Sequence, residues 1–145
     1  EGALAKFVVL TAYIPMLMDT GGNSGSQSSV TVIRALSLKE IEFSDLPVII
    51  FKEFRVSLLC GATLALCNFA KLMIFDHLTL TVSAVICLTL LVTILCAKLI
   101  GCTLPVITAK LGFDPAVMAS PFITTIVDAV SLLVYFQFAT NILKL

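Results

Sequence analysis

The sequence is poor in the side chains on which catalysis and nucleic-acid binding usually depend. Its 145 residues include no tryptophan, one histidine and only 12% charged residues, and the formal net charge is zero. One imidazole leaves little for acid–base catalysis, so no enzyme is expected. Binding to nucleic acid requires a basic surface, and the balance of charges predicts no nucleic-acid partner.

The shortage of charge is matched by an excess of apolar residues. Hydrophobic residues make up 59% of the chain and the mean hydropathy is +1.12, whereas soluble domains average about 45–50% apolar and about 25% charged residues. The composition predicts an all-α integral membrane protein in a lipid bilayer. The five cysteines form no C-x-x-C pair and lie in apolar surroundings, which favours small buried side chains over a metal or redox site.

Long apolar stretches predict a bundle of four membrane-spanning helices. About 20 residues cross a bilayer, and the spans are expected at about residues 3–34, 54–75, 78–99 and 115–143. The first and last are longer than needed and contain Pro15 and Pro121, so we expect both to be broken or kinked. Gly101 and Pro105 are expected to end or kink the third helix.

The connection between the first two predicted spans, LKEIEFSDLPVIIFKE (residues 38–53), mixes acids with apolar residues. It is either an amphipathic element at the membrane surface or an ordinary solvated linker. Ser44, followed by Pro47, is a signal for the start of a helix that leads into the second span.

Basic residues are more numerous on one side of the predicted spans. They are Arg34, Lys39, Lys52, Arg55, Lys98 and Lys110 on one side, against Lys6, Lys71 and Lys144 on the other. The positive-inside rule then predicts that both termini lie outside a plasma (inner) membrane.

Asp128 is the only charged residue between Pro115 and Leu143. A carboxylate near the middle of a bilayer costs about 2.5–3.5 kcal/mol and usually faces a partner, a cavity or an ion path. We expect no basic residue deep in a span, so a basic partner is not favoured. On a helix, one face would carry a polar stripe of Thr124, Thr125, Asp128, Ser131 and Tyr135. The hydroxyls in this stripe have an alternative, which is to bond to carbonyls of their own helix.

The first predicted span contains ten consecutive small or polar residues, TGGNSGSQSS, at positions 20–29. Such residues cannot face lipid, so they must face other helices or water. Asp19, Gly22, Asn23 and Ser26 share one helical face, with Gln27 at its edge. Gly21 and Gly25 form a G-x-x-x-G pair, which permits close packing of helices. Asp19 can equally serve as a cap at a helix break.

Both polar segments offer oxygen atoms and almost no sulfur or imidazole. Oxygen ligands suit hard cations such as Mg²⁺ and Ca²⁺, and Mg²⁺ gives up its water reluctantly. The sequence therefore predicts a pathway for a divalent, largely hydrated cation. Two alternatives stay open: a cation-coupled secondary carrier, in which broken helices meet near the midplane, and a helical assembly module without transport.

Two blocks of the chain resemble the membrane domain of the MgtE family of magnesium transporters. They are PMLMDTGGNSGSQSSVTVIRALSLKEI at residues 15–41 and GCTLPVITAKLGFDPAVMASPFITTIVDAVSLLVYF at residues 101–136. The resemblance implies a homodimer with an ion-conducting pore at or near the dimer interface. It also implies five membrane helices and cytoplasmic regulatory domains in the full-length protein. The first helix and the regulatory domains have no counterpart in this sequence, which reads as a single transmembrane domain over residues 1–145.

The resemblance also assigns residues to the pore, with Mg²⁺ as the transported ion. Asp128 matches the family's pore aspartate, which contacts hydrated Mg²⁺, and a backbone carbonyl one turn earlier corresponds to Thr124. Asp19, at a position that varies in the family, and Asn23 complete the predicted metal contacts. The predicted pore lining consists of Gly21, Gly22, Gly25, Ser26, Gln27, Thr125 and Ser131.

Overall fold

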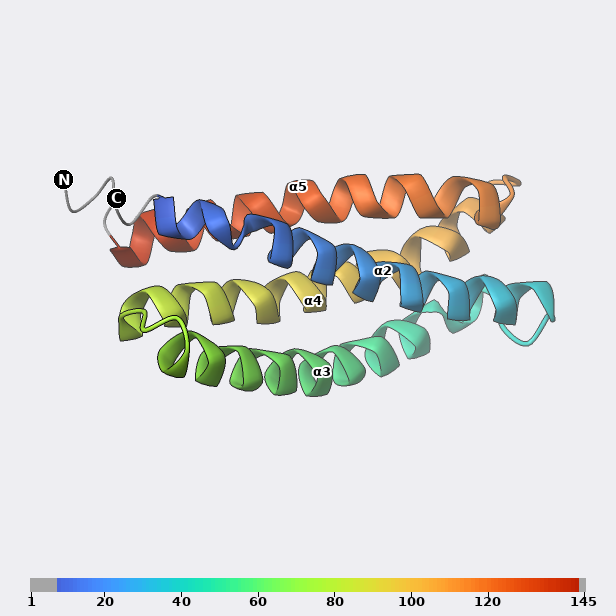
Figure 1. Ribbon diagram of the computed structural model, residues 1–145. Coiled ribbons are helices and arrows are strands. Elements are labelled where there is room, and N and C mark those ends of the chain that lie inside the picture. The colour runs from blue at the N-terminus through green and yellow to red at the C-terminus, as the bar shows by residue number, and fades with distance from the viewer. Residues whose placement is uncertain (1–7, 144–145) are drawn as a thin grey trace.

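The computed structural model describes residues 8–143 of the chain, and they form long helices that lie side by side (Figure 1). The elements are α2 (Ile14–Ser37), the short 3₁₀ helix η1 (Phe43–Asp45), α3 (Leu46–Ile74), α4 (Leu80–Lys110) and α5 (Pro115–Leu143). The described part of the chain contains no strand, which confirms the predicted all-α class.

The helix α4 is the centre of the bundle. It packs against α2, α3 and α5, while α2 also packs against α5. Figure 1 shows α3 and α5 on opposite sides of α4. This arrangement explains why α4 has the largest buried surface of the four long helices, including Val85, Ile86, Ile94 and Ala97, all completely buried.

Three helical segments within the described residues are long and apolar enough to cross a membrane. They are Phe43–Ile74, Leu80–Lys110 and Pro121–Leu143. The polar residues at positions 20–29 lower the hydropathy of α2, which is not among the three. A fourth span, formed by α2, and the pairing of two copies therefore stay predictions.

The predicted breaks in the first and last spans differ from the observed helices. The first segment is interrupted at Tyr13, just before Pro15, and α2 then continues through the whole glycine-rich stretch. A proline in the first turn is tolerated because its missing N–H would have no helical partner there. The last span is not broken, since α5 runs uninterrupted from Pro115 to Leu143 with Pro121 inside it, and a kink at Pro121 stays a prediction.

The predicted boundaries of the two middle spans were too narrow. The helix α4 does not end at residue 99 but continues through Gly101 and Pro105 to Lys110. The helix α3 begins at Leu46, eight residues earlier than expected, after a capping box in which Glu42 and Asp45 exchange hydrogen bonds. The helix-start signal at Ser44 and Pro47 is thus confirmed, and most of residues 38–53 are helical.

The closest approach between helices is at the crossing of α2 and α4, where two glycines meet. A Cβ atom on Gly101 would collide with the backbone carbonyl of Gly25. A Cβ atom on Gly25 would lie 2.9 Å from Cγ2 of Ile123 and 3.1 Å from the carbonyl oxygen of Ala97. Because neither glycine has a side chain, the backbones of α2 and α4 touch directly at this point.

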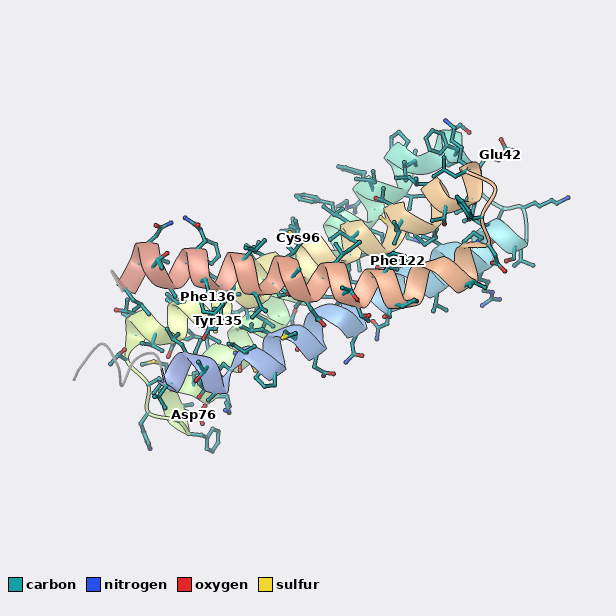
Figure 2. All side chains as sticks on the ribbon, turned by 90° about the horizontal axis from the view of Figure 1, so that it is seen from above. Glu42, Asp76, Cys96, Phe122, Tyr135 and Phe136 are labelled. Carbon is teal, nitrogen blue, oxygen red and sulfur yellow. The ribbon has the colours of Figure 1, made fainter. Side chains whose placement is uncertain are left out.

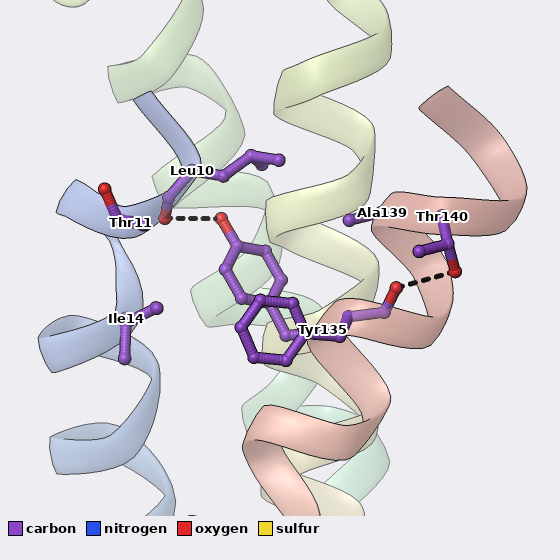
Figure 3. A pocket seen from close by; sticks show the side chains of 7 residues that line it. Leu10, Thr11, Ile14, Tyr135, Ala139 and Thr140 are labelled. Carbon is purple, nitrogen blue, oxygen red and sulfur yellow. Dashed lines mark hydrogen bonds between the residues drawn. The ribbon is translucent and has the colours of Figure 1, made fainter. Parts of the chain in front are cut away.

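Two hydroxyl groups hold the start of α2 in place. The phenol of Tyr135 donates a hydrogen bond of 2.8 Å to the carbonyl of Leu10 (Figure 3), beside an apolar cavity of about 20 Å³. Tyr135 is therefore buried, and its predicted place on a wet polar stripe is wrong. Its buried hydroxyl finds a partner in a carbonyl next to the interruption at Tyr13.

The second of these groups is the phenol of Tyr13, which donates a 2.6 Å hydrogen bond to Asp76 in the α3–α4 turn. Lys71 forms a hydrogen bond and an ion pair with the same carboxylate. The hydrogen bond from Lys71, followed by that from Tyr13, lowers the pKa of Asp76 below its ordinary value. Asp76 therefore links the α3–α4 turn to the start of α2.

Substitution of Gly101 tests the importance of the glycine crossing. We expect Gly101→Ala to lower stability by about 1–3 kcal/mol, because the new methyl group forces α2 and α4 apart. Gly61→Ala is the matched control, since its Cβ would lie at an ordinary 3.5 Å from Leu91. Thermal unfolding of the detergent-solubilised full-length protein measures both. Equal melting temperatures for the two variants would contradict the role given to the crossing.

Candidate functional site

An open groove between α2 and α5 brings together most of the predicted metal-contacting residues. It has a volume of about 240 Å³, and its lining comes from two turns of α2 and one turn of α5. The lining residues are Met18, Asp19, Gly22, Asn23, Ser26, Thr124 and Asp128. All four predicted metal contacts, Asp19, Asn23, Thr124 and Asp128, are therefore on one surface.

The α2 side of the groove is polar because of its helical spacing. Asp19, Gly22, Asn23 and Ser26 lie three or four residues apart, so they follow one another along a single face. The amide of Asn23 donates a 3.1 Å hydrogen bond to the Asp19 carboxylate. Asp19 is exposed and lies within the continuous helix α2, so it does not cap a helix break.

The α5 side of the groove is formed by Asp128 and by Thr124 one turn earlier. The Asp128 side chain is half-buried and forms no ion pair within residues 8–143. The hydroxyl of Thr124 donates a 3.1 Å hydrogen bond to the carbonyl of Pro121. A carboxylate that is free of basic partners and open to a groove is available to water or to a cation.

The other residues of the predicted pore lining do not border this groove. Gly21 and Gly25 face α4 and α5 at close-packing contacts, and Ser131 is buried with its hydroxyl bonded to the carbonyl of Val127 at 2.6 Å. Thr125 is exposed and bonds to the carbonyl of Pro121 at 2.9 Å, and Gln27 is exposed as well. The assignment of these five residues to a pore lining stays a prediction.

The groove offers oxygen atoms that can serve as ligands of a cation or as acceptors of hydrogen bonds from its water. Two carboxylates, one amide and hydroxyl oxygens line it, and no cluster of three or more His, Cys, Asp or Glu residues occurs among the residues described. A dehydrated Mg²⁺ needs six oxygen ligands in nearly ideal octahedral geometry, whereas a hydrated ion needs only acceptors for its water. The groove can supply such acceptors.

A buried cluster of charged and polar groups lies outside the groove and was not predicted. Glu53 of α3 accepts a 2.5 Å hydrogen bond from Ser28 of α2, and its carboxylate lies 3.7 Å from Nζ of Lys98 in α4. Lys98 also donates to Ser28 at 3.3 Å, and all three residues are buried. The expectation that no basic residue lies deep in a span is therefore wrong.

The cluster was missed because Lys98 was placed at a helix end. A third span that ends at residue 99 places Lys98 in its last turn, beside the following loop. The orientation prediction therefore counts Lys98 with the basic residues of that loop. Because α4 continues to Lys110, Lys98 lies well inside the helix. The available signal was Lys98 itself, the only charged residue between Asp76 and Lys110, because a lone base in an apolar helix needs a partner when it is buried.

Comparison with protein families decides the classification. The model of the MgtE family, described as a divalent cation transporter, matches residues 14–138, from the start of α2 to the last turns of α5. The chain belongs to the MgtE family. Membership confirms the resemblance seen in the two sequence blocks.

Three MgtE proteins of other organisms match almost the whole of this chain. The magnesium transporter MgtE of Thermus thermophilus is 34% identical over 99% of the chain, and that of Bacillus subtilis is 36% identical over 97%. The magnesium transporter MgtE of Enterococcus faecalis is 33% identical over 99%. The aligned residues cover 31–32% of each relative, so this MgtE-family chain spans about a third of their length.

The buried cluster predicts unequal effects of single and double substitutions. In this MgtE-family chain, Lys98→Met should destabilise the protein by about 3–5 kcal/mol, because it leaves the Glu53 carboxylate buried without its cation. Adding Glu53→Gln should recover most of that loss, since the amide oxygen still accepts the bond from Ser28. Thermal unfolding of the full-length protein gives the comparison. A double variant no more stable than Lys98→Met would rule out the charge pair as the cause.

Proposed function

We propose that this chain is part of a transmembrane pathway for Mg²⁺ and related divalent cations. The observation that carries the proposal is the groove in which Asp19 and Asn23 of α2 face the same space as Asp128 and Thr124 of α5. These polar groups lie on a bundle in which three helical segments of the described chain, α5 among them, are long and apolar enough to cross a membrane. The relatives of known name are magnesium transporters, which supports the choice of ion.

The ion passes in a largely hydrated form. Carboxylate and amide oxygens accept hydrogen bonds from the water bound to Mg²⁺, so the ion keeps its inner coordination shell. The negative charge of Asp128 favours cations, and the half-buried position strengthens its field compared with bulk water. Inward movement of a dication is favoured by about 4.6 kcal/mol per 100 mV, twice the value for a single charge.

A second copy of the chain completes the pathway. The groove is open on one side, and acidic groups at membrane depth are costly when they face lipid. Two copies that meet at their α2–α5 faces would enclose the groove and place two Asp128 carboxylates along one path. The homodimer implied by the family resemblance has this form.

The orientation proposed for the chain places both of its termini outside the plasma membrane. Figure 1 shows the start of the described chain and the end of α5 at the same end of the bundle. Lys98 no longer contributes to the charge count because it is paired with Glu53 inside the bundle. Arg34, Lys39, Lys52, Arg55 and Lys110 still outnumber Lys6, Lys71 and Lys144, so the predicted orientation keeps its basis.

Uptake of Mg²⁺ into proteoliposomes containing the full-length protein tests the role of the groove. Asp128→Ala and Asp128→Asn should each lower uptake at least about tenfold, because the variants lose a charge-assisted contact of about 1.5–3 kcal/mol to the hydrated ion. Asp19→Ala should have a smaller effect in the same direction, because Asp19 is the more exposed of the two acids.

Asp114→Asn is the matched control for removal of an acid. Asp114 lies outside the groove and accepts a hydrogen bond from the N–H of Ala116 at the start of α5, and asparagine caps helices as well as aspartate does. Normal uptake by both Asp128 variants would overturn the proposal. Strict dependence of uptake on a gradient of Na⁺ or H⁺ would instead identify a coupled carrier.

A further inference from the structure

A second groove lies on the outer surface of α3, away from the α2–α5 groove. It has a volume of about 350 Å³ and is lined by Val48, Phe51, Lys52, Arg55, Val56 and Leu59. Two cations are thus set among apolar side chains, of which Val48 and Leu59 are 71% and 72% exposed. A ligand of this groove must therefore contact exposed apolar surface and carry negative charge.

Lys52 and Arg55 have no acidic partner among the described residues. The ion pairs of that part of the chain join Lys71 to Asp76 and Lys98 to Glu53. Glu53, the acid nearest in sequence to the two cations, is buried on the opposite side of α3. Arg55 lies 5.8 Å from the centre of the Phe51 ring, a contact that orients the guanidinium but leaves its hydrogen-bond donors free.

The position of the two cations along α3 matches the boundary of the hydrocarbon layer. The helix has 29 residues, about nine more than a bilayer requires. No charged residue occurs between Arg55 and Lys71, a distance of about 24 Å along the helix axis. Lysine and arginine side chains reach several ångströms towards the headgroups, so these cations bracket a hydrocarbon layer of about 30 Å.

The groove lies towards one end of the bundle. Figure 2 shows two labelled residues at opposite ends of the bundle. They are Glu42, which directly precedes η1, and Asp76, which lies in the α3–α4 turn. Lys52 and Arg55 belong to the part of α3 that starts near Glu42. From there to Lys71 the surface of α3 carries no charged residue, and Leu59 and Leu66 are each 72% exposed.

We propose that this groove binds an anionic phospholipid. The phosphodiester lies between Lys52 and Arg55, where the guanidinium can donate two parallel hydrogen bonds to phosphate oxygens. One acyl chain follows the apolar surface past Val56 and Leu59 towards Leu66. The combination of paired cations with an adjoining charge-free surface fits a molecule that has an anionic head and a hydrocarbon tail, and fits neither a soluble anion nor a purely apolar partner.

Native mass spectrometry of the full-length protein, with phosphatidylglycerol competing against phosphatidylcholine, tests this proposal. Wild-type protein should retain phosphatidylglycerol preferentially. Lys52→Gln and Arg55→Gln should each weaken that preference about fivefold and the double variant about thirtyfold, as expected for cations near an anionic headgroup. Arg55→Lys should retain part of the preference because it keeps the charge and loses the paired hydrogen bonds.

Lys39→Gln is the matched control, since it removes an exposed cation that does not line the groove. It should leave the preference unchanged. Equal retention of the two lipids by wild-type protein would overturn the proposal, as would an undiminished preference in the double variant. Inorganic phosphate that displaces the lipid at millimolar concentration would indicate an anion site instead. Unchanged melting temperatures in phosphatidylcholine would show that the variants fold normally. The lipid-binding measurements do not depend on Mg²⁺ uptake, so they test this proposal separately from the proposed function.

Discussion

The backbone contact between Gly25 of α2 and Gly101 of α4 is the constraint on which the arrangement of the bundle depends. It lets a helix rich in polar residues approach the central helix so closely that no side chain separates them. In a membrane, where lipid is as apolar as the core, such close packing is a main source of helix association. Gly25 also packs against Ile123 of α5, so the same glycine lets α2 lie close to the helix that contributes Asp128 to the groove.

The two sides of α2 have different surroundings, and this difference explains its unusual composition. Gly21, Gly25 and Ser28 face the bundle, where the glycines allow close packing and Ser28 joins the buried pair of Glu53 and Lys98. Asp19 and Asn23 face the open groove. One stretch of small and polar residues therefore serves both packing and the proposed ion path, in which a second copy of the chain would cover the polar groups of the open groove.

Prediction from the sequence succeeded for features that depend on the spacing of residues within a single helix. The periodicity of Asp19, Gly22, Asn23 and Ser26 and the spacing of Thr124 and Asp128 correctly indicated shared faces. It failed where the outcome depended on neighbouring helices. Tyr135 has the spacing of the polar stripe, yet its hydroxyl reaches a carbonyl at the interruption near Tyr13 and is buried. Gly101 and Pro105 look like helix breakers, yet packing on both sides keeps α4 intact.

The sequence by itself determined the helical class, the apolar spans and the residues that carry oxygen ligands, because composition and helical periodicity are local properties. Only the tertiary structure decided that α2 and α5 form one groove, that Lys98 meets Glu53 and Ser28, and that Lys52 and Arg55 face outward without acidic partners. These relations join residues that are distant in sequence. They depend on how closely the helices approach, and that approach is set by the side chains that are absent at Gly25 and Gly101.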